Sequence, residues 1–218
     1  LCRSCVSHLD GTHRTCKALV AHGAKHLVLI DSISERRAPT AGRVNEAEQM
    51  SKEEWSSYRE RITTSARIGA EEYGLTVGIH AHAAGFMDFE PELERLLSEV
   101  DEEILKICFD TGHHSYAGFD PVEFMQKYIS RISYMHFKDI DPKVKQKVID
   151  NHTGFYDACG QGIFCNLGDG DVDFPTVRKI LLENNFEGWC TVEQDCDPLL
   201  DPNPLSDAQL NREYLETI

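Results

Sequence analysis

Basic residues are scarce in this sequence. Its 218 residues include 22 Lys and Arg against 37 Asp and Glu, which gives a formal net charge of −15. Because a field of this sign repels phosphates, we expect no nucleic-acid partner. No apolar run approaches the roughly 20 residues that cross a bilayer, and the first residues lack the apolar core of a signal peptide. The composition predicts a soluble globular protein that does not enter a membrane.

Cysteine is too sparse and too irregularly spaced to organise the fold. Eight Cys in 218 residues are too few for a disulfide scaffold. Cys2 and Cys5 form a single CxxC, and the remaining spacings do not fit structural zinc. Cys108 and Cys190 fall within apolar strand-like runs, which predicts buried thiols. We therefore expect a reducing, cytoplasmic compartment.

Neither a Gly-x-Gly-x-x-Gly fingerprint nor a Walker loop opens any expected helix, which argues against nucleotide binding. Instead, short apolar runs alternate with helical stretches. The expected strands cover residues 27–30, 75–80, 104–110, 132–137 and 189–193. Because no hairpin signals join these strands, they must pair in parallel through crossover connections. An open doubly wound sheet and a (β/α)8 barrel both satisfy this pattern, although a barrel needs more strands and typically about 250 residues.

The helical signals are clearest over 51–73, where Ser51 and Glu54 form a capping box. Asp120 and Asp173 are expected to cap two later helices. In contrast, the polar, glycine-rich segment 141–172 shows no core periodicity. We expect this segment to be a mobile loop or lid, and its Gly-Asp-Gly to be a turn, so a phosphorylated substrate is not indicated.

Four successive strands end in a residue that can bind a metal ion. These residues are His80, Asp110, His136 and Glu193. The carboxyl ends of parallel strands share one face, which is where α/β folds carry out chemistry. Two imidazoles and two carboxylates suit Mn²⁺, Co²⁺, Fe²⁺ or Zn²⁺ better than a metal that prefers thiolates. The pattern predicts one divalent-metal site.

Further polar residues follow the strand ends. Because residue i+2 faces the same side as residue i, His82, Lys138 and Asp195 are expected beside the metal, and His113 offers another imidazole. Lys138 could stabilise an oxyanion or act as an acid or base. We assign catalytic roles to Lys138, His82 and His113, and the alternative for Lys138 is a surface residue paired with Asp139. His114 and His152 lack a strand-end position and are expected at the surface.

Four motifs in order resemble a known family over residues 12 to 200. They are Asp110-Thr111-Gly112-His113, His136-Phe137-Lys138-Asp139, Gly168-Asp169-Gly170-Asp171-Val172-Asp173-Phe174 and Gly188-Trp189-x-x-Val192-Glu193-Gln194-Asp195-x-Asp197-Pro198. They resemble the xylose isomerase-like TIM-barrel superfamily and are most similar to inosose (2-keto-myo-inositol) dehydratases and neighbouring sugar isomerases and epimerases.

This resemblance implies a TIM barrel with one divalent metal at its mouth, held at the four strand-end positions. Mn²⁺ or Co²⁺ is expected first, with Zn²⁺ or Mg²⁺ as alternatives. Most of the superfamily has Glu-Asn-His where this chain has His80-Ala81-His82, and the inosose dehydratase-like branch is His-rich there. His80 is accordingly the least secure ligand, and Glu92 is an acidic alternative.

By the same resemblance, the expected strands are barrel strands four to eight. Residues 1–218 are then one TIM-barrel domain whose N-terminal βα units are missing, either as a fragment or as a partial barrel completed by another chain. Such a sheet would expose apolar edges. Association of the chain with copies of itself is therefore one of the alternatives.

The implied function is metal-dependent dehydration of a polyol ketone, an inosose-like cyclitol or sugar, through an enediolate. One alternative is a sugar isomerase or epimerase of the same superfamily, and another is a truncated, non-catalytic remnant that binds metal or sugar. Endonuclease IV-like DNA repair shares the fold, but the acidic charge disfavours it.

Overall fold

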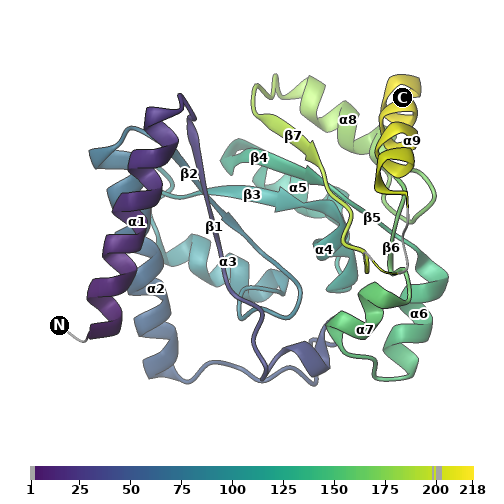
Figure 1. The fold of residues 1–218 in the computed structure, drawn as a ribbon, viewed down its shortest axis with the longest axis horizontal. Helices are drawn as coiled ribbons and strands as arrows, with labels where there is room; N and C mark the ends of the chain where they lie inside the picture. Colours follow the sequence, from purple (N-terminus) through teal and green to yellow (C-terminus); the bar gives the residue numbers. More distant parts are fainter. Residues whose placement is uncertain (1–2, 198, 200–202) are drawn as a thin grey trace.

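The computed structural model describes residues 3–197, 199 and 203–218. Its centre is a five-stranded parallel sheet in the order β1-β2-β3-β4-β7, which forms a half-barrel (Figure 1). The strands are β1 (His26–Ile30), β2 (Thr76–His80), β3 (Lys106–Asp110), β4 (Ile132–Phe137) and β7 (Trp189–Val192). The five expected strands and their parallel pairing are confirmed. Cys2 of the CxxC pair and Pro198 of the last motif lie outside the described residues.

Helices flank this sheet, with α1 and α2 near β1 and with α8 and α9 near β7, while α6 and α7 lie beyond the strand ends (Figure 1). They are α1 (Arg3–Ala21), α2 (Lys52–Arg67), α3 (Glu90–Glu99), α4 (Thr111–Tyr116), α5 (Pro121–Tyr128), α6 (Pro142–Asp150), α7 (Phe155–Gly160), α8 (Phe174–Glu183) and α9 (Pro204–Thr217). Short turns of other helix types are η1 (Ala38–Thr40), η2 (Ile68–Glu72) and η3 (Ile129–Arg131). Within the described chain, none of these helices is long and apolar enough to cross a membrane.

The expected helix boundaries are set by local hydrogen bonds. Ser51 Oγ accepts from the Glu54 amide at 3.1 Å, and the Glu54 carboxylate accepts from the Ser51 amide at 2.8 Å. The side chains of Asp120 and Asp173 cap α5 and α8 by accepting from the amides of Val122 and Thr176. After η2, Gly74 adopts a φ of +64°, which turns the chain into β2. These caps explain why the sequence located the starts of α2, α5 and α8 correctly.

The register of the sheet places the metal-binding candidates side by side. Asp110 pairs with His136 across β3 and β4, and His80 pairs with Cys108 across β2 and β3. The Glu193 amide donates to the carbonyl oxygen of Phe137 at 3.0 Å, so Glu193 continues the β7 ladder. All four strand ends therefore open on the same face.

Segment 141–172 is not the sparsely packed loop that we expected. It contains α6, α7 and β6 (Phe164–Cys165), and β6 pairs antiparallel with β5 (Asp139–Ile140). Val148, Phe155, Ala158, Ile163 and Phe164 are buried there in a second apolar cluster. The prediction of few core residues was wrong because these elements are too short to show a helical or strand period in the sequence.

Two expectations about single residues were also wrong. Cys108 is buried as predicted, but Cys190 is exposed, because β7 has a neighbouring strand on one side only. His114 is buried rather than at the surface: its ring packs against Phe124 with centroids 4.7 Å apart, and its Nε2 lies 3.3 Å from Glu90. His152 is exposed and contacts a carboxylate at the surface, as expected.

Candidate metal centre

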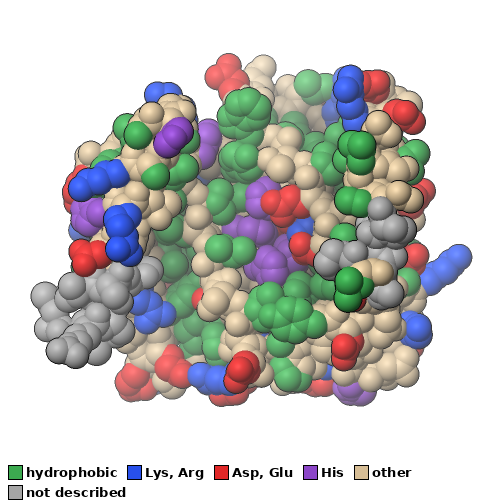
Figure 2. Space-filling model, in the orientation of Figure 1, with side chains coloured by type: hydrophobic (Ala, Val, Ile, Leu, Met, Phe, Trp, Pro, Cys, Tyr) green, Lys and Arg blue, Asp and Glu red, His purple; other side chains and the backbone are tan. Residues whose placement is uncertain are grey.

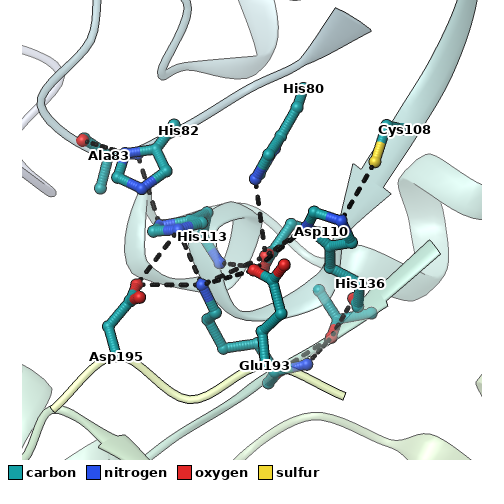
Figure 3. A network of polar contacts seen from close by, with 11 residues as sticks. His80, His82, Ala83, Cys108, Asp110, His113, His136, Glu193 and Asp195 are labelled. Carbon is teal, nitrogen blue, oxygen red and sulfur yellow. Dashed lines mark hydrogen bonds and ion pairs between the residues drawn. The ribbon is translucent and has the colours of Figure 1, made fainter. Parts of the chain in front are cut away.

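The four strand-end residues converge on one point, as Figure 3 shows. Each of His80, Asp110, His136 and Glu193 offers one ligand atom, and these atoms lie within 4.8 Å of one another. We call these residues the four-ligand cluster. His136 Nδ1 lies 3.2 Å from Glu193 Oε2 and 3.6 Å from Asp110 Oδ2. His80 Nε2 lies 4.0 Å from the same Asp110 oxygen, so Asp110 is the centre of the group.

The two carboxylate oxygens of Asp110 have different surroundings: one caps a helix and the other faces the four-ligand cluster. Oδ1 accepts from the His113 amide at 2.8 Å and caps helix α4. Oδ2 and His136 Nδ1 are both buried, and neither has a hydrogen-bond partner among the described residues. Both atoms have ion-pair contacts, but buried polar atoms without a hydrogen bond are costly unless something satisfies them. A divalent cation held by His80, Asp110, His136 and Glu193 would satisfy both atoms. The donor set thus fits a divalent metal.

Burial and charge set the protonation of this cluster. Burial opposes ionisation of Asp110, but the Lys138 ammonium and neighbouring imidazoles outweigh burial and hold its pKa well below the usual range. Burial likewise opposes charge on His136, yet contacts with Asp110, Cys108 and Glu193 raise its pKa to about 12. Burial lowers the pKa of His80 to about 4. A cation and the proton on His136 would therefore compete for the same place between the carboxylates.

Lys138 lies next to the four-ligand cluster and is only 1% exposed. Its Nζ is 3.0 Å from Asp195 Oδ2, 3.0 Å from His113 Nε2 and 3.4 Å from Asp110 Oδ2. The alternative of a surface lysine paired with Asp139 is wrong. Although burial disfavours the ammonium, the charges of Asp110 and Asp195 outweigh it and raise the pKa of Lys138.

The carboxylate of Asp139, the residue after Lys138, accepts hydrogen bonds from backbone amides and does not pair with Lys138. Its Oδ2 accepts from the amides of Gly168 at 2.8 Å and Gly170 at 3.1 Å, and its Oδ1 accepts from Val172 at 3.1 Å. A Cβ at Gly170 would lie 2.2 Å from Asp139 Oδ1. The Gly-Asp-Gly motif is thus the turn that we expected, closed around a buried carboxylate.

Two residues of the Asp-Thr-Gly-His motif hold Lys138 in place. Thr111 Oγ1 donates to the Lys138 carbonyl oxygen at 2.7 Å. A Cβ at Gly112 would lie 2.5 Å from Lys138 Cγ, which is closer than real side chains approach. Thr111 thus fixes the backbone of Lys138, and Gly112 leaves space for the aliphatic part of its side chain.

His82 and His113 lie beside Lys138 as expected, with ring centroids 4.0 Å apart. Burial lowers the pKa of both, so both imidazoles are neutral. We call Lys138, His82, His113 and Asp195 the lysine cluster. In Figure 2 the purple imidazoles gather at the middle of the visible face, among green apolar side chains.

Sequence reasoning missed the aromatic wall of the site. The Phe155 ring lies 5.5 Å from His82, and the Phe164 ring lies 5.0 Å from Lys138 Nζ. Both come from segment 141–172, where the aromatic residues in an otherwise polar stretch were the available signal. A wall of this kind lowers water access to the lysine cluster.

Glu92, the acidic alternative to His80, lies outside the four-ligand cluster. Its carboxylate accepts from Arg37 at 2.8 Å and 3.2 Å and from the Phe89 amide at 3.1 Å. Arg37 is itself buried. These bonds fix the start of α3 and occupy both carboxylate oxygens, while His80 takes the position in the cluster.

Known proteins share this fold and parts of this sequence. A family model described as "Xylose isomerase-like TIM barrel" matches residues 5–218. An inosose dehydratase of Clostridium botulinum is 36% identical over 164 residues, which cover 75% of this chain and 54% of that protein. The rhizopine catabolism protein MocC of Rhizobium meliloti is 32% identical over 193 residues, which cover 88% and 58%. The chain therefore spans about half the length of the curated relatives it matches.

Solved structures show the same fold at lower identity. The probable 3-DHS dehydratase AsbF of Bacillus anthracis superimposes with a TM-score of 0.72 at 18% identity, covering 95% of this chain and 69% of that one. The IOLI protein, solved with a bound zinc atom, gives a TM-score of 0.68 at 16% identity, covering 94% and 66%. By the family match along almost its whole length, and by a half-barrel sheet of the same fold, this chain belongs to the xylose isomerase-like TIM-barrel family.

Proposed function

We propose that this chain carries the metal centre and the proton-transfer groups of a lyase that dehydrates a polyol ketone, with inosose as the first candidate substrate. The observation that carries the proposal is the convergence of the four-ligand cluster with a buried lysine and two neutral imidazoles. Relatives named inosose dehydratase, at 32–36% identity, support the substrate class.

The cluster of ligands fits the first step of such a reaction. A bound divalent cation would polarise a ketone and its neighbouring hydroxyl, which makes the adjacent C–H bond more acidic. His82 and His113, being neutral, can accept that proton or return it to a departing hydroxyl. Lys138 can donate a hydrogen bond to the oxygen on which negative charge develops. Phe155 and Phe164 keep water away from these groups.

Apolar side chains on the two edge strands of the sheet are exposed, which is relevant to how the whole domain is built. We propose that residues 1–218 belong to one TIM-barrel domain, in which β1 to β4 and β7 are barrel strands four to eight. Ile30 on the edge strand β1 is 53% exposed, and Trp189 on the opposite edge strand β7 is 67% exposed. Further βα units, on the same or another polypeptide, would cover both edges.

The activity is tested with the purified chain, Mn²⁺ or Co²⁺, and 2-keto-myo-inositol. Mass spectrometry should detect a product that has lost one water, and Asp110→Asn should remove this activity. A product of unchanged mass would identify an isomerase or epimerase instead. Tight substrate binding without any product would identify a non-catalytic binding protein. Comparing Mn²⁺ and Co²⁺ with Zn²⁺ and Mg²⁺ in the same assay tests the choice of metal.

A further inference from the structure

A second set of metal-binding side chains adjoins the four-ligand cluster. His82, His113 and Asp195 each offer one ligand atom, and these atoms also lie within 4.8 Å of one another. The residues come from the loop after β2, from α4 and from the segment after β7 (Figure 3). His82 Nδ1 lies 2.8 Å from the Ala83 carbonyl oxygen, to which it donates, so Nε2 carries the lone pair. Metal-ligating imidazoles typically bond to a carbonyl in this way.

The Lys138 ammonium lies among these atoms, where a second cation would be expected. It is within 3.0 Å of both His113 Nε2 and Asp195 Oδ2. It is also 3.4 Å from Asp110 Oδ2, an oxygen of the four-ligand cluster. A second metal ion bridged to the first through Asp110 would need this same volume.

The charges of the two sets agree with this arrangement. Asp110, Glu193 and Asp195 contribute three carboxylates to the two sets, each with one negative charge. One divalent cation together with one ammonium group balances these charges. Buried charges of one sign are stable only when they are paired or bind metal, so without the lysine the site would retain a negative charge.

We propose that Lys138 is a built-in cation that fills a second metal position and restricts this centre to a single metal ion. The inference rests on the proposed metal at the four-ligand cluster and adds to it. It gives Lys138 a role in metal stoichiometry that is separate from its proposed hydrogen bond to the developing oxyanion.

The test compares the metal content of the wild-type chain with that of Lys138→Met, which has a similar length and no charge. After saturation with Mn²⁺ and dialysis, elemental analysis should find one ion per chain in the wild type and two in the variant. The electron paramagnetic resonance spectrum of bound Mn²⁺ should show coupling between two ions in the variant only. Lys138→Arg keeps the charge and should stay at one ion, and Lys138→Met with His113→Gln should return to one.

The outcomes separate the two proposals. A wild-type chain that binds no metal contradicts the four-ligand site itself. One ion in the wild type and still one in a folded Lys138→Met overturns the lysine proposal. If Lys138→Met does not fold, the wild-type chain is titrated with Co²⁺ and its absorption spectrum is followed. The spectral change should saturate at one equivalent of Co²⁺ per chain. Saturation at two equivalents overturns the proposal.

Discussion

Gly112→Ala tests whether the space beside Lys138 is essential. The added Cβ would lie 2.5 Å from Lys138 Cγ, 2.8 Å from its Cβ and 3.0 Å from its carbonyl carbon, so backbone as well as side chain must move. Overpacking of a buried site costs about 1–3 kcal/mol, while alanine gains up to about 1 kcal/mol over glycine within a helix. Because backbone atoms are involved, we expect a net loss of about 2 kcal/mol in the free energy of unfolding.

For a chain of this size, such a loss lowers the melting temperature by about 4–8 °C. Differential scanning calorimetry measures this change, and the affinity for Mn²⁺ should fall with it because Lys138 contacts Asp110. Gly11→Ala is the matched control, since a Cβ there meets nothing within 4 Å. That variant should be as stable as the wild type or slightly more stable. A Gly112→Ala protein with the wild-type melting temperature and Mn²⁺ affinity would refute the packing argument.

Three other changes test the site and its surroundings. Removing Asp110 or Glu193 by substitution with Ala should abolish metal retention after dialysis. Glu92→Ala removes the ion pair with Arg37 and the cap of α3 but no member of the four-ligand cluster, so the folded variant should retain the metal. Since the metal displaces the proton that His136 holds with a pKa of about 12, metal affinity should fall about tenfold per pH unit as the pH is lowered, and calorimetry in two buffers should detect the released proton. Phe164→Ala should cost about 3–5 kcal/mol and make segment 141–172 the first site of limited proteolysis; unchanged protection would contradict the second apolar cluster.

The sequence was informative about the sheet because each parallel strand leaves a local signal. Buried strands need β-branched and apolar runs, and helix starts need caps such as Ser51, so both are visible without tertiary information. The convergence of His80 and Asp110 also follows from topology alone, since parallel strands end on one face. The expected topology was therefore enough to predict which side chains meet in the four-ligand cluster.

The remaining features depend on contacts between distant segments. Phe164 reaches Lys138 only because β6 folds back on β5, which no local period reveals. Cys190 lies in a run as apolar as that of Cys108, but it is exposed because its strand is at the edge of the sheet. The partners of Lys138 were equally hidden, since pairing with the adjacent Asp139 was as compatible with the sequence as the contact with Asp195.

The Asp-Thr-Gly-His motif shows how four adjacent residues can serve one centre through different interactions. Asp110 uses one oxygen to start α4 and turns the other toward the metal position. Thr111 binds the Lys138 backbone, and Gly112 leaves space for its stem. His113, one turn into the helix, then meets the Lys138 ammonium. Since a single helix start positions both Asp110 of the four-ligand cluster and His113 of the lysine cluster, a shift of α4 would disturb the two clusters together.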